Sequence, residues 1–272
     1  MKTVVVVNGE SDWQAFLPGV SVRQRWLQSC SWIYQDGGLW VVDREGALRV
    51  DGVLWRLGAV RPEPSHRAAL ELIRLAGVPC VNPAATLLRG YDRLGMLNEL
   101  KAAGLPIHLA TVVSAPAALG RIEPELPAVI KAGNLHGGWG KALLRDRESW
   151  HDLRDMLFAS EEYVTLEPHV EYVRDIRVLD VGGEQWAMAR RGAGWKANVA
   201  TTHYELIDPP APLAAMTRRA MEHLGADLLG LDFLETAGGE FVLLESNDIP
   251  GLSGFPDAAR QTVARIMRER LR

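Results

Sequence analysis

Residues 230–251 read GLDFLETAGGEFVLLESNDIPG, with an apolar run on either side of Gly238-Gly239. This pattern is typical of a β-hairpin with a tight glycine turn. If the two glycines form the loop, counting outward sets Asp232 directly opposite Glu245, with Cβ atoms about 4.5–5.5 Å apart. Asn247 then points to the same face, because side chains alternate along a strand.

Two carboxylates and an amide on one face require a counter-charge, since like charges placed opposite each other destabilise a sheet. A hard divalent cation, Mg²⁺ or Mn²⁺, held together with a phosphate-bearing ligand, matches these oxygen donors. The alternative is a register shifted by one residue, in which the acids are ordinary solvated strand positions. The hairpin alone leaves both interpretations open, so the rest of the chain has to decide.

The composition predicts a folded protein of one large domain or two to three small ones. The 272 residues are 47% hydrophobic and 24% charged, enough to form a core. A net charge of −4 and a pI near 6.0 argue against a nucleic-acid binder that relies on general electrostatic attraction. Cys30 and Cys80 lack CxxC spacing, which favours a reducing cytoplasm. The apolar run at 3–7 ends at Asn8, as in a buried strand rather than a signal peptide, and no run approaches the roughly 20 apolar residues of a membrane span.

The first ninety residues alternate between strand and helix patterns, which predicts a small α/β domain with a partly parallel sheet. We expect strands at 3–7, 31–35, 39–43, 51–56 and 78–82, and helices at 22–29 and 63–76. Beyond them, a short helix from Pro83 and a second one from Tyr91-Asp92 to Gly104 precede strands at 107–113, 127–131, 141–144 and 164–166. Further helices are expected at 147–158, 210–225 and 256–271.

Lys131 ends a predicted strand, and the loop AGNLHGGWG follows at 132–140. A glycine-rich loop between two strands can be a flap whose backbone N–H groups approach phosphates closely. It can equally be a plain hairpin turn, and it does not match the P-loop pattern because no GKS or GKT occurs. His136 and Trp139 are the side chains in this loop with the greatest functional potential.

A second hairpin is predicted to turn at Gly182-Gly183, which sets Asp175 opposite Arg190 and Arg177 opposite Met188 on one face. One interpretation is a surface ion pair that contributes little to stability. The other is a basic strand face for a phosphate or carboxylate, which arginine binds with both arms of its guanidinium. Two arginines beside one acid leave positive charge over and favour the second.

The order of these features resembles the ATP-grasp superfamily, and most closely the branch of the ribosomal-protein glutamate ligases. The features are a lysine at a strand end, a glycine-rich flap, the Glu-x-x-Val segment at 167–170, the Asp-Ile-Arg-Val strand at 175–178 and the Asp232…Glu245-x-Asn247 signature. The resemblance covers essentially the whole chain and implies an α/β fold: an N-terminal pre-ATP-grasp domain at 1–90, a lid subdomain at 91–165 and a C-terminal grasp subdomain at 166–272. It further implies a dimer or tetramer.

Carried over by motif, the resemblance implies that ATP lies between the two grasp subdomains. Lys131 would contact the α- and β-phosphates, and the loop from Gly133 to Gly140, with Gly137, Gly138 and Trp139, would close over the triphosphate. Glu167, His169 and Val170 would read the adenine edge and Asp175 would hold the ribose. Mg²⁺ (or Mn²⁺) would be bound by Asp232, Glu245 and Asn247. The γ-phosphate and the acyl-phosphate intermediate would face Arg177 and Arg190, with Asn198 nearby.

The chain departs from the family's pattern at two positions. Arg93 stands where similar ligases carry a lysine that contacts the nucleotide, so the resemblance implies a nucleotide contact here from a bulkier, forked group of the same charge. Pro168 removes one backbone N–H from the segment expected to bind adenine.

The resemblance implies an ATP-dependent carboxylate–amine ligase that acts through an acyl phosphate. Its substrates would be a small-molecule or peptide carboxylate and an amine, with no nucleic acid or membrane as partner. Two alternatives stay open: a kinase of the same fold that phosphorylates a hydroxyl, and a nucleotide-binding relative without turnover.

Overall fold

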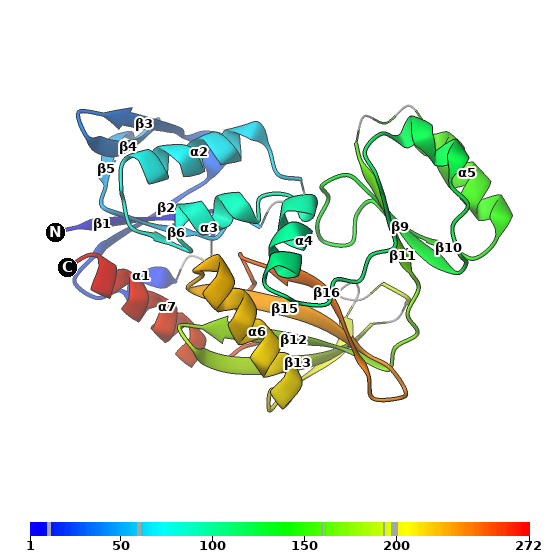
Figure 1. The fold of residues 1–272 in the computed structure, drawn as a ribbon. Helices are drawn as coiled ribbons and strands as arrows, with labels where there is room; N and C mark the ends of the chain where they lie inside the picture. The colour runs from blue at the N-terminus through cyan, green and yellow to red at the C-terminus, as the bar shows by residue number, and fades with distance from the viewer. Residues whose placement is uncertain (10–11, 59–60, 159, 161, 193, 197–200) are drawn as a thin grey trace.

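The computed structural model describes residues 1–9, 12–58, 61–158, 160, 162–192, 194–196 and 201–272. Figure 1 shows the chain with its two ends close together, the N-terminal strands beside α7, and the lid sheet with α5 at the far end. The expected position Asn198 lies outside the described residues. None of the described helices is long and apolar enough to cross a membrane.

The N-terminal sheet is parallel, with strand order β2-β1-β6-β7. Its strands are β1 (Thr3–Val7), β2 (Ser21–Arg25), β6 (Gly52–Trp55) and β7 (Cys80–Val81). The helix expected at 22–29 is wrong. That segment forms β2, followed by a 3-10 turn at Leu27–Ser29. β2 pairs along the whole of β1, and this tertiary pairing overrides its local pattern.

A small antiparallel sheet covers this domain, formed by β3 (Ser31–Gln35), β4 (Gly38–Asp43) and β5 (Gly46–Val50). The first two strands confirm the sequence prediction, whereas β5 was not predicted. The helices are α1 (Trp13–Phe16), α2 (Pro64–Leu75) and α3 (Ala84–Arg89). The proline at the start of α2 needs no N–H partner there, and Gly77 beyond its end takes a positive φ of 63°.

The lid sheet has strand order β10-β9-β11-β8 and is antiparallel in the β10–β9, β9–β11 and β11–β8 pairs. Its strands are β8 (Thr111–Val113), β9 (Ala128–Ala132), β10 (Lys141–Leu144) and β11 (Val164–Pro168). α4 (Arg93–Ala102) leads into it, and α5 (Arg147–Leu157) covers it with the buried Trp150. Asp146 caps α5 as expected, accepting the Ser149 N–H at 2.8 Å.

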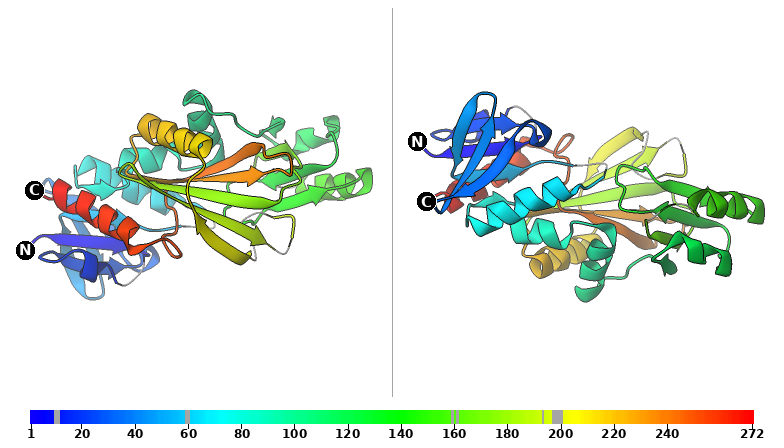
Figure 2. Two further views of the ribbon diagram at one scale, coloured as in Figure 1. Left: turned by 90° about the horizontal axis from the view of Figure 1, so that it is seen from below. Right: turned by 90° about the horizontal axis from the view of Figure 1, so that it is seen from above.

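The largest sheet is antiparallel, with strand order β14-β13-β12-β15-β16. Its strands are β12 (Arg174–Val181), β13 (Glu184–Gly192), β14 (Thr201–Ile207), β15 (Leu228–Glu235) and β16 (Phe241–Asn247). α4 and α6 (Ala211–Leu224) pack on one face of this sheet, and α7 (Asp257–Arg270) lies between it and the N-terminal strands (Figure 2). The sheet therefore contacts both other parts of the molecule and carries the two hairpins.

The first hairpin has the predicted register, with Asp175 opposite Arg190 and Arg177 opposite Met188. In the second, Asp232 lies opposite Glu245 as predicted, but the Gly238-Gly239 loop is wrong. Thr236 and Glu240 still pair, at 2.9 Å, so the loop runs from Ala237 to Gly239. A bulge at Leu244 makes up the difference, because Phe233 pairs with Leu243 and Asp232 with Glu245.

Candidate nucleotide and metal site

Asp232 lies at the centre of an ion-pair network on the sheet and is 1% exposed. Arg177, its register partner on β12, donates from Nε and Nη2 to the two carboxylate oxygens at 2.7 Å each. Arg190 donates to Oδ1 at 3.0 Å and also to Asp175. Burial by itself would raise the pKa of Asp232, but the two arginines outweigh it and lower the pKa to about 2. The carboxylate is therefore charged at neutral pH.

A second buried network joins the lid to α4 and consists of Arg93, Lys131 and Glu167. The side chains are 5%, 7% and 3% exposed. Lys131 Nζ and Arg93 Nη2 each donate to one oxygen of Glu167. Burial, and then the neighbouring Arg93 charge, lowers the pKa of Lys131 to about 8. Two cations thus share one carboxylate in a water-poor space.

Glu245 lies between the two networks. Its Oε2 is 3.5 Å from Arg93 Nη1 and 3.9 Å from Lys141 Nζ, so both partners are at the long end of ion-pair distance. Burial would raise the pKa of Glu245, but Lys141 and Arg93 outweigh this and lower it. Among the described residues the combined cluster contains the acids Asp175, Glu167, Asp232 and Glu245, and the cations Arg93, Lys131, Lys141, Arg177 and Arg190. Positive charge is in excess, which suits an anionic ligand.

The predicted metal ligands lie close together on two neighbouring strands: Glu245 lies opposite Asp232, and Asn247 lies two residues further along β16, opposite Gly230. Within the described parts of the chain, no group of three or more His, Cys, Asp or Glu side chains is placed to hold a metal ion. The predicted set instead combines two carboxylates with the amide oxygen of Asn247, which accepts the Ile249 N–H at 3.2 Å. These hard oxygen donors fit Mg²⁺ chemistry, and Glu245, with its long ion pairs, is the most available of them.

A crevice of about 60 Å³ opens between the lid sheet and the large sheet. It brings together several predicted residues, namely Lys131, Glu167, His169, Val170 and Glu245. It also contains Trp195 and Lys196, which the sequence suggests as specificity positions, and three residues that the sequence prediction missed: His108, Lys141 and Tyr172. These residues carry no motif spacing. Lys141 had a usable signal, because it starts the strand paired with β9 and lies directly opposite Lys131.

The segment expected to bind adenine is partly engaged with protein groups. The N–H of His169 donates to Pro127 O at 3.1 Å, and the carbonyl of Pro168 lies 2.8 Å from the His108 ring nitrogen. Asp175 is 1% exposed and paired with Arg190, and it does not line the crevice. The structure therefore separates Asp175 from the crevice that holds the other residues of the predicted nucleotide site.

The glycine-rich loop is tied down at both ends. Asn134 Oδ1 accepts the Arg93 N–H at 3.0 Å, and Lys196 Nζ donates to Gly138 O at 3.1 Å. A Cβ at Gly140 would lie 2.9 Å from Ala132 O, so this position requires glycine. Trp139 is 65% exposed, whereas Gly137 and the neighbouring His136 line a different cavity.

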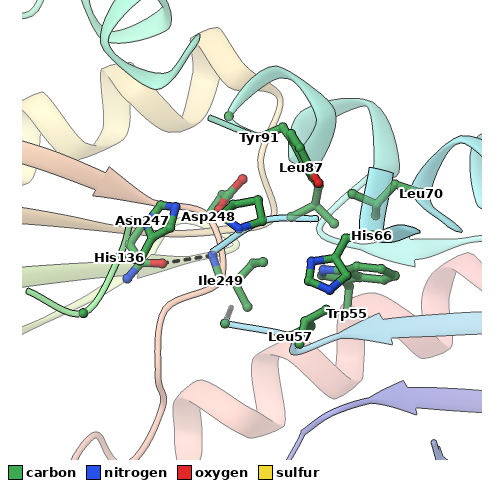
Figure 3. A pocket seen from close by; sticks show the side chains of 14 residues that line it. Trp55, Leu57, His66, Leu70, Leu87, Tyr91, His136, Asn247, Asp248 and Ile249 are labelled. Carbon is green, nitrogen blue, oxygen red and sulfur yellow. Dashed lines mark hydrogen bonds between the residues drawn. The ribbon is translucent and has the colours of Figure 1, made fainter. Parts of the chain in front are cut away.

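That second cavity has a volume of about 270 Å³ and lies beyond the end of β16 (Figure 3). Its walls come from the N-terminal domain, the glycine-rich loop and the segment after Asn247. Asp248 lines it, and burial raises the pKa of this carboxyl to about 7. Burial also lowers the pKa of His66 and of His136, which both line the cavity.

Comparisons with known proteins show which proteins this chain resembles. Residues 111–221 match the family model described as Synapsin, ATP binding domain. The chain is 27% identical over 223 residues to a glutamate–LysW ligase of Sulfolobus acidocaldarius, which covers 75% of this chain and 77% of that protein. A RimK domain ATP-grasp protein from Sphaerobacter thermophilus superposes with a TM-score of 0.71 over 99% of this chain and 98% of its own, at 18% identity. The chain therefore has the fold of the ATP-grasp ligases and resembles them in sequence.

A ribosomal protein bS6–L-glutamate ligase of Salmonella paratyphi B is a further relative of this chain. It is 26% identical over 197 residues, which is 69% of this chain and 65% of the ligase. The chain thus spans about two thirds of that relative's length. The structural match over nearly the full chain confirms the predicted α/β fold with ATP-grasp architecture.

Proposed function

We propose that this ATP-grasp protein is an ATP-dependent carboxylate–amine ligase that forms an amide bond through an acyl phosphate. The observation that carries the proposal is the buried cluster in which Asp232 and Glu245 are surrounded by arginine and lysine side chains. Its excess positive charge and its place between two cavities suit a triphosphate on one side and an acceptor on the other. The named relatives, which are ligases for glutamate, support the same class of reaction.

We assign ATP to the crevice between the lid and the large sheet, which at about 60 Å³ is closed in this structure and would have to widen by movement of the lid to admit the nucleotide. Val170 in the hinge would offer its N–H to adenine, because Pro168 has none and that of His169 is already donated to Pro127. Lys131 would leave Glu167 in part to contact the phosphates, while Arg93 keeps Glu167 paired. The loop from Gly133 to Gly140, with Gly137, Gly138 and Trp139, would cover the triphosphate, and Asp175 would act on the ribose side through its pair with Arg190.

Asp232, Glu245 and Asn247 would hold Mg²⁺, which neutralises phosphate charge and orients the reacting phosphoryl group when it is bound. Arg177 and Arg190 hold Asp232 ionised, and they would turn toward the γ-phosphate and the substrate carboxylate once the metal shares Asp232. Asn198 would lie nearby. Positioning and charge neutralisation therefore account for catalysis, since phosphoryl transfer asks little covalent chemistry of the protein.

The organisation into a pre-ATP-grasp domain at 1–90, a lid at 91–165 and a grasp subdomain at 166–272 is part of this proposal. So are the partners: a small-molecule or peptide carboxylate, and an amine, in the cytoplasm. The relatives' names point to glutamate and to protein acceptors. The identity of this chain's own carboxylate is left to the experiment.

The test measures ADP and free phosphate release from Mg·ATP with mixtures of amino acids and peptides, with and without an amine. Amine-stimulated phosphate release with an amide product in the mass spectrum supports the ligase. ADP without free phosphate means a kinase, and no turnover means a nucleotide binder. The double variant Asp232→Asn with Glu245→Gln should lose turnover, and amine-dependent ADP release that survives in it contradicts the metal assignment.

A further inference from the structure

The 270 Å³ cavity beyond β16 is lined by one carboxylate and, among the described residues, by no lysine or arginine. The carboxylate is Asp248, the first residue after the strand that carries Glu245 and Asn247. No described cation forms an ion pair with it at 4.0 Å or less. The cavity thus lacks the excess of cations found in the cluster beside it, and its one acidic side chain would accept a hydrogen bond from an amine or ammonium group more readily than it would tolerate a second carboxylate.

The position of Asp248 is built into the chain. Its own carbonyl accepts from Asn82 Nδ2 at 2.6 Å, which fixes the backbone. A Cβ at Gly90 would lie 2.9 Å from Asp248 Oδ2, so the carboxylate occupies this place only because residue 90 has no side chain. Figure 3 shows the Asp248 side chain at the cavity with Leu87 and Tyr91 near it.

His66 lines the same cavity, and its Nε2 lies 3.9 Å from Glu63 Oε2, which is beyond hydrogen-bond distance. The ring is 5% exposed, and its Nδ1 accepts the Glu63 N–H at 3.2 Å in the capping box of α2. The neutral ring therefore carries its proton on Nε2. That buried Nε2 has no hydrogen-bond partner, and burial lowers the pKa of the ring, which keeps the neutral form. A buried N–H without an acceptor is costly, so a ligand oxygen is the natural partner.

The remaining walls are apolar and limit the size of the ligand. They consist of Trp55, Leu57, Leu70, Leu87 and Ile249. A volume of about 270 Å³ lies below the roughly 300–1,000 Å³ of pockets for drug-sized molecules, so it suits one amino-acid-sized body. Charge, donor and walls together describe a small apolar molecule with an ammonium group and an acceptor oxygen.

We propose that this cavity binds the amine substrate of the ligase, and that this substrate is an apolar primary amine of amino-acid size. Its ammonium group pairs with Asp248, its carbonyl or carboxamide oxygen accepts from His66 Nε2, and its side chain lies against the apolar walls. This inference rests on the proposed ligase activity, because only a ligase would use the bound amine as a substrate. Binding of the amine itself can be tested without turnover.

The experiment titrates leucinamide into the protein in the presence of Mg·ADP and measures binding by calorimetry. Leucinamide carries the amine, the oxygen and the apolar body but no carboxylate, so it cannot take the place of the carboxylate substrate. The comparison ligand is 4-methylpentanamide, which lacks only the amine. We expect 4-methylpentanamide to bind at least about 30-fold more weakly than leucinamide. The substitution Asp248→Asn should weaken the binding of leucinamide by a similar factor.

Two further variants complete the test. Asp155→Asn removes an acid whose side chain is 70% exposed and should leave leucinamide binding unchanged. Gly58→Leu adds bulk at the cavity wall where a new Cβ meets no atom within 4 Å, so it should weaken leucinamide while the protein stays folded and binds ADP. Equal binding of the two amides, no binding of leucinamide at millimolar concentration, or insensitivity to both Asp248→Asn and Gly58→Leu overturns the inference.

The two proposals fail separately. If leucinamide binds in an Asp248-dependent way but no ATP is turned over, the cavity assignment stands and the proposed ligase activity is wrong. If other amines stimulate phosphate release and leucinamide does not bind, the ligase proposal stands and the proposal of an apolar amine substrate in this cavity is wrong.

Discussion

Arg177 and Asp232 are register partners on β12 and β15, and the guanidinium contacts both carboxylate oxygens at 2.7 Å. Asp232 is thereby held ionised although it is 1% exposed. Under the proposed function, Arg177 and a metal ion would compete for the same two oxygens. The arginine would keep the carboxylate ionised until a phosphate attracted the guanidinium away.

Replacing Arg177 by Met should destabilise the protein by about 3–5 kcal/mol, because it leaves a buried carboxylate short of its main partner. Chemical denaturation of the wild type and the variant measures the difference. Arg154→Met is the matched control. Its pair with Asp155 lies at the surface and is worth at most about 1 kcal/mol. Equal effects of the two substitutions would show that Asp232 does not depend on Arg177.

ATP affinity should fall as the pH rises through about 8, because Lys131 then loses its proton and its attraction for the phosphates. Its pKa in the folded chain lies below the ordinary value of 10.5, so between these two values the unfolded chain binds more protons. The contribution of Lys131 to the free energy of unfolding therefore increases as the pH rises across that window. Calorimetric titration of ATP at pH 7 to 9 measures the affinity. Lys131→Arg, which stays charged, should flatten the profile, and an unchanged slope contradicts the role of Lys131.

Arg93→Lys restores the residue that similar ligases carry and should keep ADP affinity within about tenfold of the wild type. A lysine can still donate to Glu167, but it cannot also reach Glu245 as the forked guanidinium does. Arg93→Met removes both contacts and should cost about 1.5–3 kcal/mol of stability. Calorimetry with ADP and thermal unfolding measure the two quantities. Loss of ADP binding in Arg93→Lys would mean that the arginine itself contacts the nucleotide.

Chelation of divalent cations should abolish nucleotide turnover, and added Mg²⁺ should restore it. Glu245→Gln keeps the side-chain size but removes a charged oxygen, so the Mg²⁺ concentration for half-maximal phosphate release should rise by about tenfold or more. A magnesium titration of both proteins at fixed ATP measures this. Glu240→Gln, in an exposed position beside the hairpin loop, is the control and should behave as the wild type.

Counting outward from Gly238-Gly239 predicts Asp232 opposite Glu245, and the structure has this pair because two departures from the predicted hairpin cancel. The loop is longer than Gly238-Gly239 by Ala237, which shifts the register, and the bulge at Leu244 shifts it back. A bulge leaves no reliable mark in a single sequence, since Leu244 is as apolar as its neighbours. The hairpin at Gly182-Gly183 has no bulge, and there the same counting is correct from Asp175 to Glu184.

Other features depend on contacts between distant segments, which local patterns do not contain. β2 is a strand because β1 offers it an open edge. β5, by contrast, pairs with β4 across the local turn Arg44-Glu45. Lys131 and Glu167 could be found by motif, whereas His66 and Asp248 meet only after the chain brings the start of α2 to the end of β16. Motifs therefore predicted residues of the proposed nucleotide site, whereas the cavity is formed by the topology of the fold.

Asn82 forms hydrogen bonds with backbone groups of Asp227, Leu228 and Asp248 from one side chain. The same region has a single hydrophobic core that combines Val4 and Val6 of the first strand with Val263 and Met267 near the C-terminus. The beginning and the end of the chain must therefore come together before the site can form. A nascent chain still lacking α7 cannot complete this core, so activity should emerge only after α7 has been synthesised and has packed on β1, however early the lid folds.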